Sequence, residues 1–252
     1  MEVKYSLKDI KKTLTHRISV SAALVYNPLS IGLVWIIANF TKITPNQITY
    51  IDFLVGLSSA WCFFQGAPFY LILGALLFGF AIVLDWTDGK LARLKNKESA
   101  VGLFLDSALG SVILSLNILA LTYGQFRVTG QEIFLVLGIA IFSIYFMLAT
   151  FGVAKKDAED SHVRGEAKST TEADRYNFLG KLKGLRGYFR KKGILPFFNF
   201  DEAHTLIFII GPIFGIIKEC LLLTLLFGLL TLIFYLVVFI KDLSRLRSNH
   251  NR

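Results

Sequence analysis

Much of this chain is a series of apolar runs, most of them about as long as a helix that crosses a bilayer. Six such runs lie at 46–65, 68–90, 100–124, 131–153, 203–217 and 220–240. A transmembrane helix needs about 20 mostly apolar residues. Charged residues make up only 18% of the 252 residues, against roughly 25% in soluble domains. We therefore predict an all-α integral membrane protein with six transmembrane helices.

The N-terminal part of the chain has a different character. Residues 1–20 alternate charged and apolar side chains and lack the long apolar core of a cleavable signal peptide. They favour an amphipathic interfacial helix. The apolar stretch 20–40 contains Asn27-Pro28, which we expect to interrupt it, so we predict that it lies along the membrane interface. The predicted organisation is an interfacial or cytosolic segment 1–42, a six-helix domain 43–241 with a cytosolic loop 155–202, and a cytosolic tail 242–252.

Basic residues are distributed very unevenly between the two sides of this predicted topology. Of 27 Lys and Arg, all but two fall on one side, in segments 1–42, 90–97, 155–204 and 241–252. The exceptions are Arg127 and Lys218. Basic loops stay in the cytoplasm, so we predict that both termini and the active site are cytosolic; in a prokaryote the membrane would be the cell or inner membrane. Cytoplasmic loops and anionic membrane lipids account for the net charge of +9, and no nucleic-acid partner is expected.

Three aspartates stand at the predicted cytosolic ends of two spans. Asp85 and Asp88 close the second span, and Asp106 lies one turn into the third, four residues after Gly102. Residues three or four apart share a helix face, and charges at membrane depth usually mark function. If these two helices pack as an antiparallel hairpin, the three carboxylates converge. A hard cation with oxygen ligands, Mg²⁺ or Mn²⁺, would offset their repulsion.

The same residues resemble the signature of the CDP-alcohol phosphotransferase (CDP-alcohol phosphatidyltransferase) family. That signature is D-x-x-D-G-x-x-A-R, then about eight residues, then G-x-x-x-D-x-x-x-D. The matching residues here are Asp85, Asp88, Gly89, Ala92, Arg93, Gly102 and Asp106. Residues 44–49, TPNQIT, also resemble the Pro-Asn-x-x-Thr that opens the first span in such enzymes. The resemblance is weak after about residue 155.

The resemblance implies an enzyme that moves a phosphatidyl or related phospho-alcohol group from a CDP-linked donor to a polar acceptor and releases CMP, as in phospholipid biosynthesis. It implies two divalent ions, Mg²⁺ or Mn²⁺, held by Asp85, Asp88 and Asp106. The implied nucleotide site consists of Asn46, Thr49, Asp85, Gly89, Ala92, Arg93 and Gly102. Members commonly dimerise, so a homodimer is also expected. Among the loop cations, Lys181, Lys183 and Arg186 are candidates for binding an acceptor phosphate.

One residue departs from the signature: its fourth aspartate, the usual metal ligand and general base, is Gly110 here. Three explanations stay open. The acceptor needs no base, because it arrives ionised or because a metal lowers the pKa of its bound hydroxyl. Alternatively Asp52 is the base, since it follows Thr49 by three residues on one helix face. Or the chain is a CDP- or metal-binding protein without transfer activity. The otherwise intact signature favours retained catalysis, with Asp106 among the catalytic residues.

Overall fold

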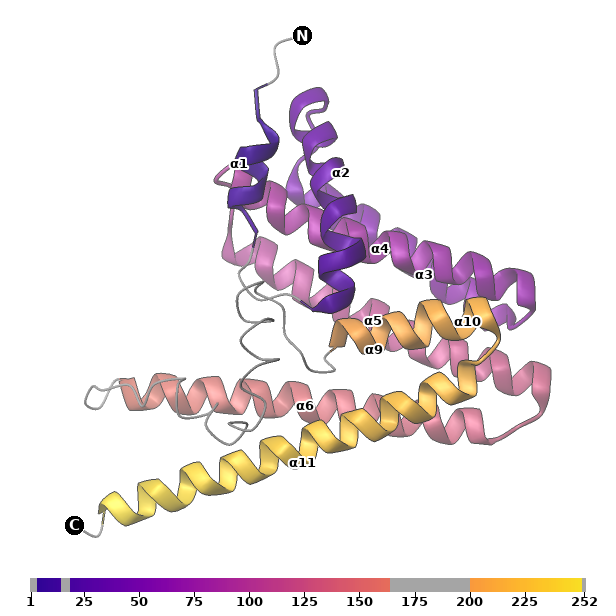
Figure 1. Ribbon diagram of the computed structural model, residues 1–252, viewed down its shortest axis with the longest axis vertical. Helices are drawn as coiled ribbons and strands as arrows, with labels where there is room; N and C mark the ends of the chain where they lie inside the picture. Colours follow the sequence, from indigo (N-terminus) through magenta and orange to yellow (C-terminus); the bar gives the residue numbers. More distant parts are fainter. Residues whose placement is uncertain (1–3, 15–18, 164–199, 251–252) are drawn as a thin grey trace.

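The computed structural model describes residues 4–14, 19–163 and 200–250, with side chains given except in the C-terminal parts of α6 and α11. Within these ranges every regular element is a helix, which confirms the predicted all-α class. The elements, in chain order, are α1 (Leu7–Lys12), η1 (Ala22–Tyr26), α2 (Asn27–Phe40), α3 (Pro45–Gln65), α4 (Pro68–Leu94), α5 (Ala100–Thr129), α6 (Ile133–Val163), α9 (Phe200–Thr205), η3 (Leu206–Ile210), α10 (Gly211–Phe214) and α11 (Ile217–His250) (Figure 1).

The helices that carry the signature begin and end at recognisable capping residues. Thr44 precedes α3, where its side chain accepts a hydrogen bond from the backbone N–H of Gln47, and the Gln47 side chain accepts one from the N–H of Thr44. This reciprocal capping box satisfies two otherwise unpaired donors. Ser99 caps α5 in a related way, accepting from the N–H of Gly102 at 3.0 Å. α3 ends at Gly66 with φ +72°, a conformation that glycine adopts without strain.

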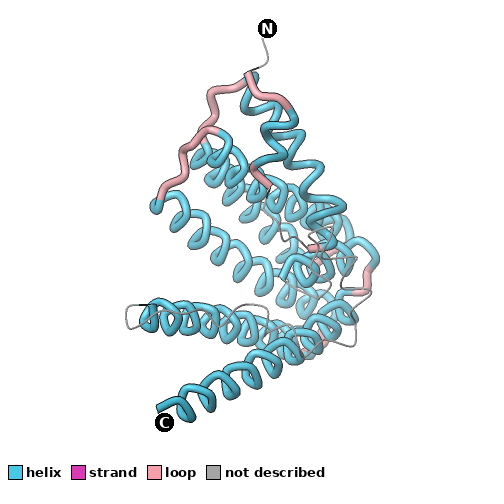
Figure 2. The backbone as a smooth tube through the Cα atoms, turned by 60° about the vertical axis from the view of Figure 1, so that its left-hand side comes forward, coloured by secondary structure: helices cyan, strands magenta, loops and turns pink. Residues whose placement is uncertain are grey.

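Helix α3 lies at the centre of the part that concerns function. It packs extensively against both α4 and α5, antiparallel to α4 and parallel to α5. A buried apolar cluster joins the three to the C-terminal segment, and its members include Phe63, Phe78, Ile113, Leu121 and Phe208. Helices α6 and α11 pack on each other and form a pair that diverges from the other helices (Figure 2). The extensive packing of α4 and of α5 on α3 thus holds the two signature helices in place.

The prediction that Asn27-Pro28 interrupts the 20–40 stretch is wrong. The chain is helical from Ala22 to Phe40, and the turn before the proline is a π-helix in which the N–H of Asn27 bonds to the carbonyl of Ala22. Proline lacks an N–H and crowds the carbonyl four residues earlier, and the wider π turn relieves that conflict. The same solution recurs at Pro212, which follows η3.

Five helices in the described part are long and apolar enough to cross a membrane. They are Ala22–Phe40, Pro45–Gln65, Pro68–Leu94, Ala100–Thr129 and Ile133–Thr150. This set is consistent with an integral membrane protein. The predicted span 203–217 appears as the helical run α9–η3–α10, and the predicted span 220–240 lies within α11. The count of six spans stays a prediction, as does the interfacial position of 20–40, although α2 runs across the direction of α3 and α4 in Figure 1.

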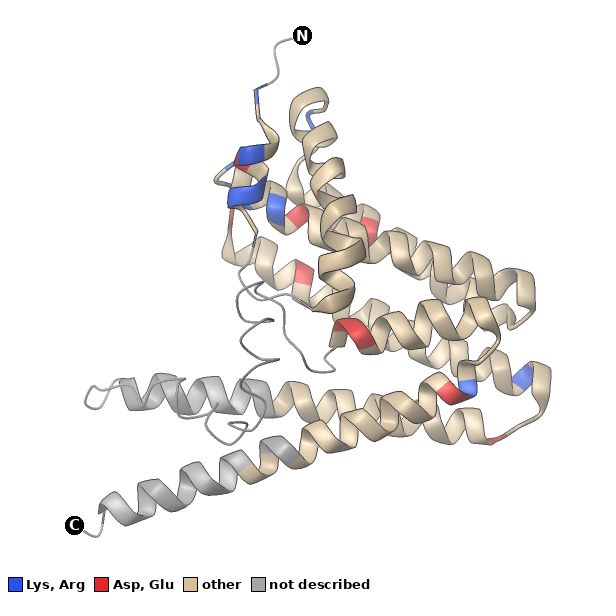
Figure 3. Cartoon of the chain, in the orientation of Figure 1, with Lys and Arg blue, Asp and Glu red and all other residues tan. Residues whose placement is uncertain are grey.

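The N-terminal helix α1 is short and two-faced. Ile10 is fully buried in a cluster with α2, α3 and α4, whereas Lys8, Lys11 and Lys12 are exposed. Tyr5 and Asn39 exchange two hydrogen bonds, of 2.9 and 3.1 Å, which fasten the segment to α2. Figure 3 shows Lys and Arg gathered on α1 and at helix ends, whereas several acidic residues lie within the helices. α1 therefore presents a basic outer face next to the end of α4.

Candidate active site

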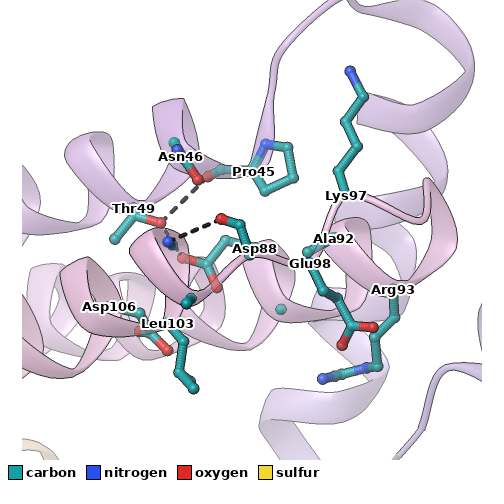
Figure 4. A pocket seen from close by; sticks show the side chains of 14 residues that line it. Pro45, Asn46, Thr49, Asp88, Ala92, Arg93, Lys97, Glu98, Leu103 and Asp106 are labelled. Atoms are coloured by element: carbon teal, nitrogen blue, oxygen red, sulfur yellow. Dashed lines mark hydrogen bonds between the residues drawn. The ribbon is translucent and has the colours of Figure 1, made fainter.

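A cavity of about 400 Å³ opens where the N-terminal turns of α3 and α5 meet the C-terminal turns of α4 (Figure 4). Its lining comes from the start of α3, the end of α4 with the loop that follows, and the start of α5. The residues are Pro45, Asn46, Thr49, Asp88, Gly89, Ala92, Arg93, Lys97, Glu98, Ser99, Ala100, Gly102, Leu103 and Asp106. Eight of the predicted site residues are among them: Asn46, Thr49, Asp88, Gly89, Ala92, Arg93, Gly102 and Asp106. The structure thus brings together residues that the sequence only suggested would meet.

Helix α3 contributes the polar groups that meet the carboxylates of α4 and α5. The hydroxyl of Thr49 donates to Asp88 Oδ2 at 2.5 Å, and Figure 4 shows the two side chains turned toward each other. Thr49 and Asp88 are both nearly fully buried, at 6% and 5% exposure. Asn46 lies against α5, where a Cβ added to Gly102 would be 3.3 Å from Asn46 Oδ1. Glycine at 102 therefore keeps α5 close to Asn46.

The carboxylates occupy two successive helical turns. Asp88 and Asp106 line the cavity itself. Asp85 precedes Asp88 by one turn on α4, and Asp52 follows Thr49 by one turn on α3. Both therefore lie about 4.5 Å deeper along their helices, where Asp52 is buried and the Asp85 side chain is exposed. Asp85 interacts electrostatically with Asp106, Asp52 and Asp88, and Asp52 interacts with Asp88 and Asp106. The predicted convergence is therefore observed, and it includes Asp52 as a fourth member.

The donor set fits a divalent cation in its chemistry. Among the described residues, no three Asp, Glu, His or Cys side chains already stand in an arrangement that would hold a metal ion. Four mutually repelling carboxylates nevertheless supply the hard oxygen ligands that Mg²⁺ and Mn²⁺ prefer. One oxygen, Asp52 Oδ1, is enclosed without a hydrogen-bond partner, which is costly for a carboxylate that has no compensating charge. A cation among these groups would offset their mutual repulsion.

Arg93 is oriented by a residue that the sequence did not single out. Its Nε donates to the backbone carbonyl of Thr13 at 2.9 Å, just beyond the end of α1. A Cβ on Gly89 would lie 3.6 Å from the Arg93 guanidinium, an ordinary van der Waals distance. The docked N-terminal segment is thus part of the site. No motif marks Thr13, because its contribution is a backbone carbonyl.

Cations gather at the rim of the cavity. Lys97 lines it together with Arg93, and the ammonium of Lys95 donates to the carbonyl of Ile43 at 3.3 Å. Partial burial, assisted by the positive charges of Lys97 and Lys4, lowers the pKa of Lys95. This crowding of positive charge beside a group of carboxylates suits a ligand that carries anionic groups and brings or meets divalent cations.

Lys90, inside the signature, has a structural position. It is 1% exposed, and its ammonium donates to Ser30 Oγ at 2.9 Å and to the carbonyl of Trp86 at 3.0 Å while lying 4.5 Å from the centre of the Trp86 ring. These contacts fasten α4 to α2 outside the cavity. Sequence reasoning passed over this residue.

The remaining predicted residues fall outside the cavity lining. Asp85 and Asp52 belong to the deeper turn described above. Gly110 is half-buried, and a Cβ added there would meet nothing within 4 Å. The candidate phosphate-binding residues of the loop lie outside the described residues, and their role stays a prediction; they are Lys181, Lys183 and Arg186.

Comparison with known proteins finds similarity in the part of the chain that contains this cavity. The model of the CDP-alcohol phosphatidyltransferase family matches residues 42–183, more than half of the chain. A bifunctional IPC transferase and DIPP synthase from Archaeoglobus fulgidus is 43% identical over 84 residues, which cover 32% of this chain and 16% of the relative. Its counterpart from Thermococcus kodakarensis is 38% identical over 68 residues, 27% of this chain and 15% of the relative.

A smaller relative gives a similar result. An archaetidylinositol phosphate synthase from Pyrococcus horikoshii is 41% identical over 67 residues, which cover 27% of this chain and 34% of the relative. The aligned part thus spans about a third of this relative and about a sixth of the bifunctional ones.

Proposed function

Because the chain belongs to the CDP-alcohol phosphatidyltransferase family, we propose that it transfers a phosphatidyl or related phospho-alcohol group from a CDP-linked donor to a polar acceptor and releases CMP. The observation that carries this proposal is the cavity itself. It joins Asp88 and Asp106 to the Arg93 guanidinium within about 400 Å³. A nucleoside diphosphate requires carboxylates that bind its metal-bound phosphates, a cation that binds the phosphates directly, and glycines that let it approach the backbone closely.

Members of this family generally use divalent metals, and we propose that Asp85, Asp88 and Asp106 hold one or two of them, Mg²⁺ or Mn²⁺. When bound, such ions neutralise a pyrophosphate and stabilise charge on the oxygens that attack and leave phosphorus. The residues of the chain itself do the rest. Thr49 fixes one oxygen of Asp88 by its hydrogen bond, which leaves the carboxylate in one orientation. Arg93, held by Thr13, faces the donor phosphates.

We propose that the site faces the cytosol. The rim cations belong to the segments that the uneven distribution of Lys and Arg assigns to that side. A lipid-linked donor would enter sideways from the membrane, past the exposed apolar residues of the first turns of α5. Leu103 and Phe104 are 68% and 70% exposed there. A soluble acceptor would reach the cavity from the cytosolic rim.

The test is metal-dependent CMP release by the purified protein. The protein is incubated with Mn²⁺ or Mg²⁺, CDP-diacylglycerol or another CDP-alcohol, and a pool of alcohols and phosphorylated alcohols. Release that requires both metal and acceptor is the expected result. CDP-dependent thermal stabilisation without release under any of these conditions would contradict the proposal and favour a binding protein.

Arg93→Lys is expected to lower kcat/KM for the donor about tenfold or more. The single ammonium of lysine cannot both donate to the Thr13 carbonyl and reach the donor, and a hydrogen bond to a charged group contributes about 1.5–3 kcal/mol. Initial rates at varied donor concentration measure the effect. Arg127→Lys is the matched control, because Arg127 is exposed at the opposite end of α5. An unchanged donor kcat/KM in Arg93→Lys would remove Arg93 from the donor site.

A further inference from the structure

The register between α3 and α5 is fixed by close contacts along their length. A Cβ on Gly56 would lie 2.7 Å from the Ile113 side chain, so the two helices touch there. Asn117 donates to the Gly56 carbonyl at 3.1 Å and accepts from the Ser59 hydroxyl at 2.9 Å. Both Ser59 and Asn117 are fully buried. Buried hydrogen bonds of this kind leave little freedom for the helices to slide.

This register places Asp52 beside the turn of α5 that ends at Gly110. Toward the cavity, Asn46 is level with Gly102, and away from it Gly56 is level with Ile113. Asp52 lies between these two contacts on α3. Since the helices are parallel and these contacts are offset by 56 and 57 residues, Asp52 is level with residues 108–109 of α5, next to Gly110.

Asp52 lies among the aspartates of the site. Its side chain is 6% exposed and interacts electrostatically with Asp88 and Asp106. Its Oδ1 atom is enclosed and accepts no hydrogen bond. A buried carboxylate oxygen without a donor is costly. Such an oxygen is explained if a substrate hydroxyl or another group supplies the missing donor.

At the level of Gly110, helix α5 offers free space and no carboxylate of its own. A Cβ there would meet nothing within 4 Å. The nearby hydroxyl of Ser111 already donates to the carbonyl of Ser107 at 2.7 Å, and a serine hydroxyl is a poor base near neutral pH. The deeper turn thus has a carboxylate on α3 and an open position on α5.

We propose that Asp52 supplies the carboxylate that Gly110 lacks, so that the fourth acidic group of the site has moved from α5 to α3. This inference rests on the proposed function. In the transfer step, the acceptor hydroxyl oxygen bonds to phosphorus as the bond from phosphorus to the CMP oxygen breaks, and the hydroxyl proton passes to the Asp52 carboxylate. CMP leaves with the electron pair of the broken bond.

The test is a swap of the carboxylate between the two helices. Asp52→Asn is expected to lower kcat about 100-fold, the usual contribution of a general base, with the donor KM little changed. The double variant Asp52→Asn/Gly110→Asp is expected to have a kcat about tenfold above that of Asp52→Asn or higher, because the space at residue 110 admits the new side chain. Asp52→Glu, which keeps a carboxylate, is expected to have a higher kcat than Asp52→Asn. Glu132→Gln, a change at an exposed residue in the turn after α5, is the control.

A second readout separates a base from a metal ligand. Thermal stabilisation by Mn²⁺ and CDP should be unchanged in Asp52→Asn, since the other three aspartates remain. A wild-type kcat in Asp52→Asn would overturn the proposal. An equal loss of kcat in all three variants, Asp52→Asn, Asp52→Glu and the double variant, would overturn it as well. Loss of the Mn²⁺ response in Asp52→Asn would overturn the assignment as base. Absence of CMP release in the wild-type protein would instead defeat the proposed function, and the role of Asp52 with it.

Discussion

Asp88→Asn is expected to reduce CMP release about 1000-fold while leaving the protein folded. A catalytic cation contributes several kcal/mol to the stability of the transition state, and each roughly 1.4 kcal/mol corresponds to a factor of ten in rate. Asparagine keeps the shape of the side chain, and its amide oxygen can still accept the hydrogen bond of Thr49. The variant therefore removes charge and a metal ligand without removing the contact between α3 and α4.

Two measurements check this expectation. Turnover is compared at saturating donor and Mn²⁺, and Mn²⁺-dependent thermal stabilisation is followed in the same preparations. Both should be lost in Asp88→Asn and retained in Glu132→Gln, which neutralises an exposed carboxylate remote from the cavity. A variant that keeps its Mn²⁺ response and turns over at the wild-type rate would show that Asp88 binds no metal.

Gly124→Ala is expected to lower the free energy of unfolding by about 3 kcal/mol, near the upper part of the range for overpacked cores. A Cβ on Gly124 would lie only 2.2 Å from the Phe63 carbonyl oxygen and 3.1 Å from that of Phe64. Both obstacles are backbone atoms, which cannot turn away as a flexible side chain can. The methyl group must therefore push α5 away from the end of α3.

Thermal unfolding in detergent measures this effect. Gly32→Ala is the matched control, because glycine 32 also lies inside a helix and a Cβ there meets nothing within 4 Å. Alanine should stabilise that position slightly, since it is the better helix former. Because α5 also carries Asp106, Gly124→Ala should lower transfer activity as well. Equal melting temperatures for Gly124→Ala and the wild-type protein would contradict the close approach of α3 and α5.

The all-α class of the protein and most of the residues around its cavity could be predicted from local sequence patterns. In apolar runs of membrane length, a helix satisfies the backbone hydrogen bonds within the run itself. The observed helices α3, α4 and α5 follow the predicted runs closely. The signature spacing placed Asp85 and Asp88 on one face, because three residues make nearly one helical turn. These are local consequences of helical periodicity, and they require no knowledge of the neighbouring helices.

The way in which the helices meet could not be predicted from such local patterns, because it depends on contacts between residues far apart in the chain. The Asn27-Pro28 pair looked like a break, but a π turn before it keeps the helix continuous, an accommodation that residue preferences do not disclose. Thr13 acts through a backbone carbonyl, which any residue could supply. Asp52 and Gly110 are 58 residues apart in the chain, and their adjacent levels depend on where α3 and α5 touch. Side-chain packing and buried hydrogen bonds set that register, so it belongs to the folded molecule and not to any local pattern.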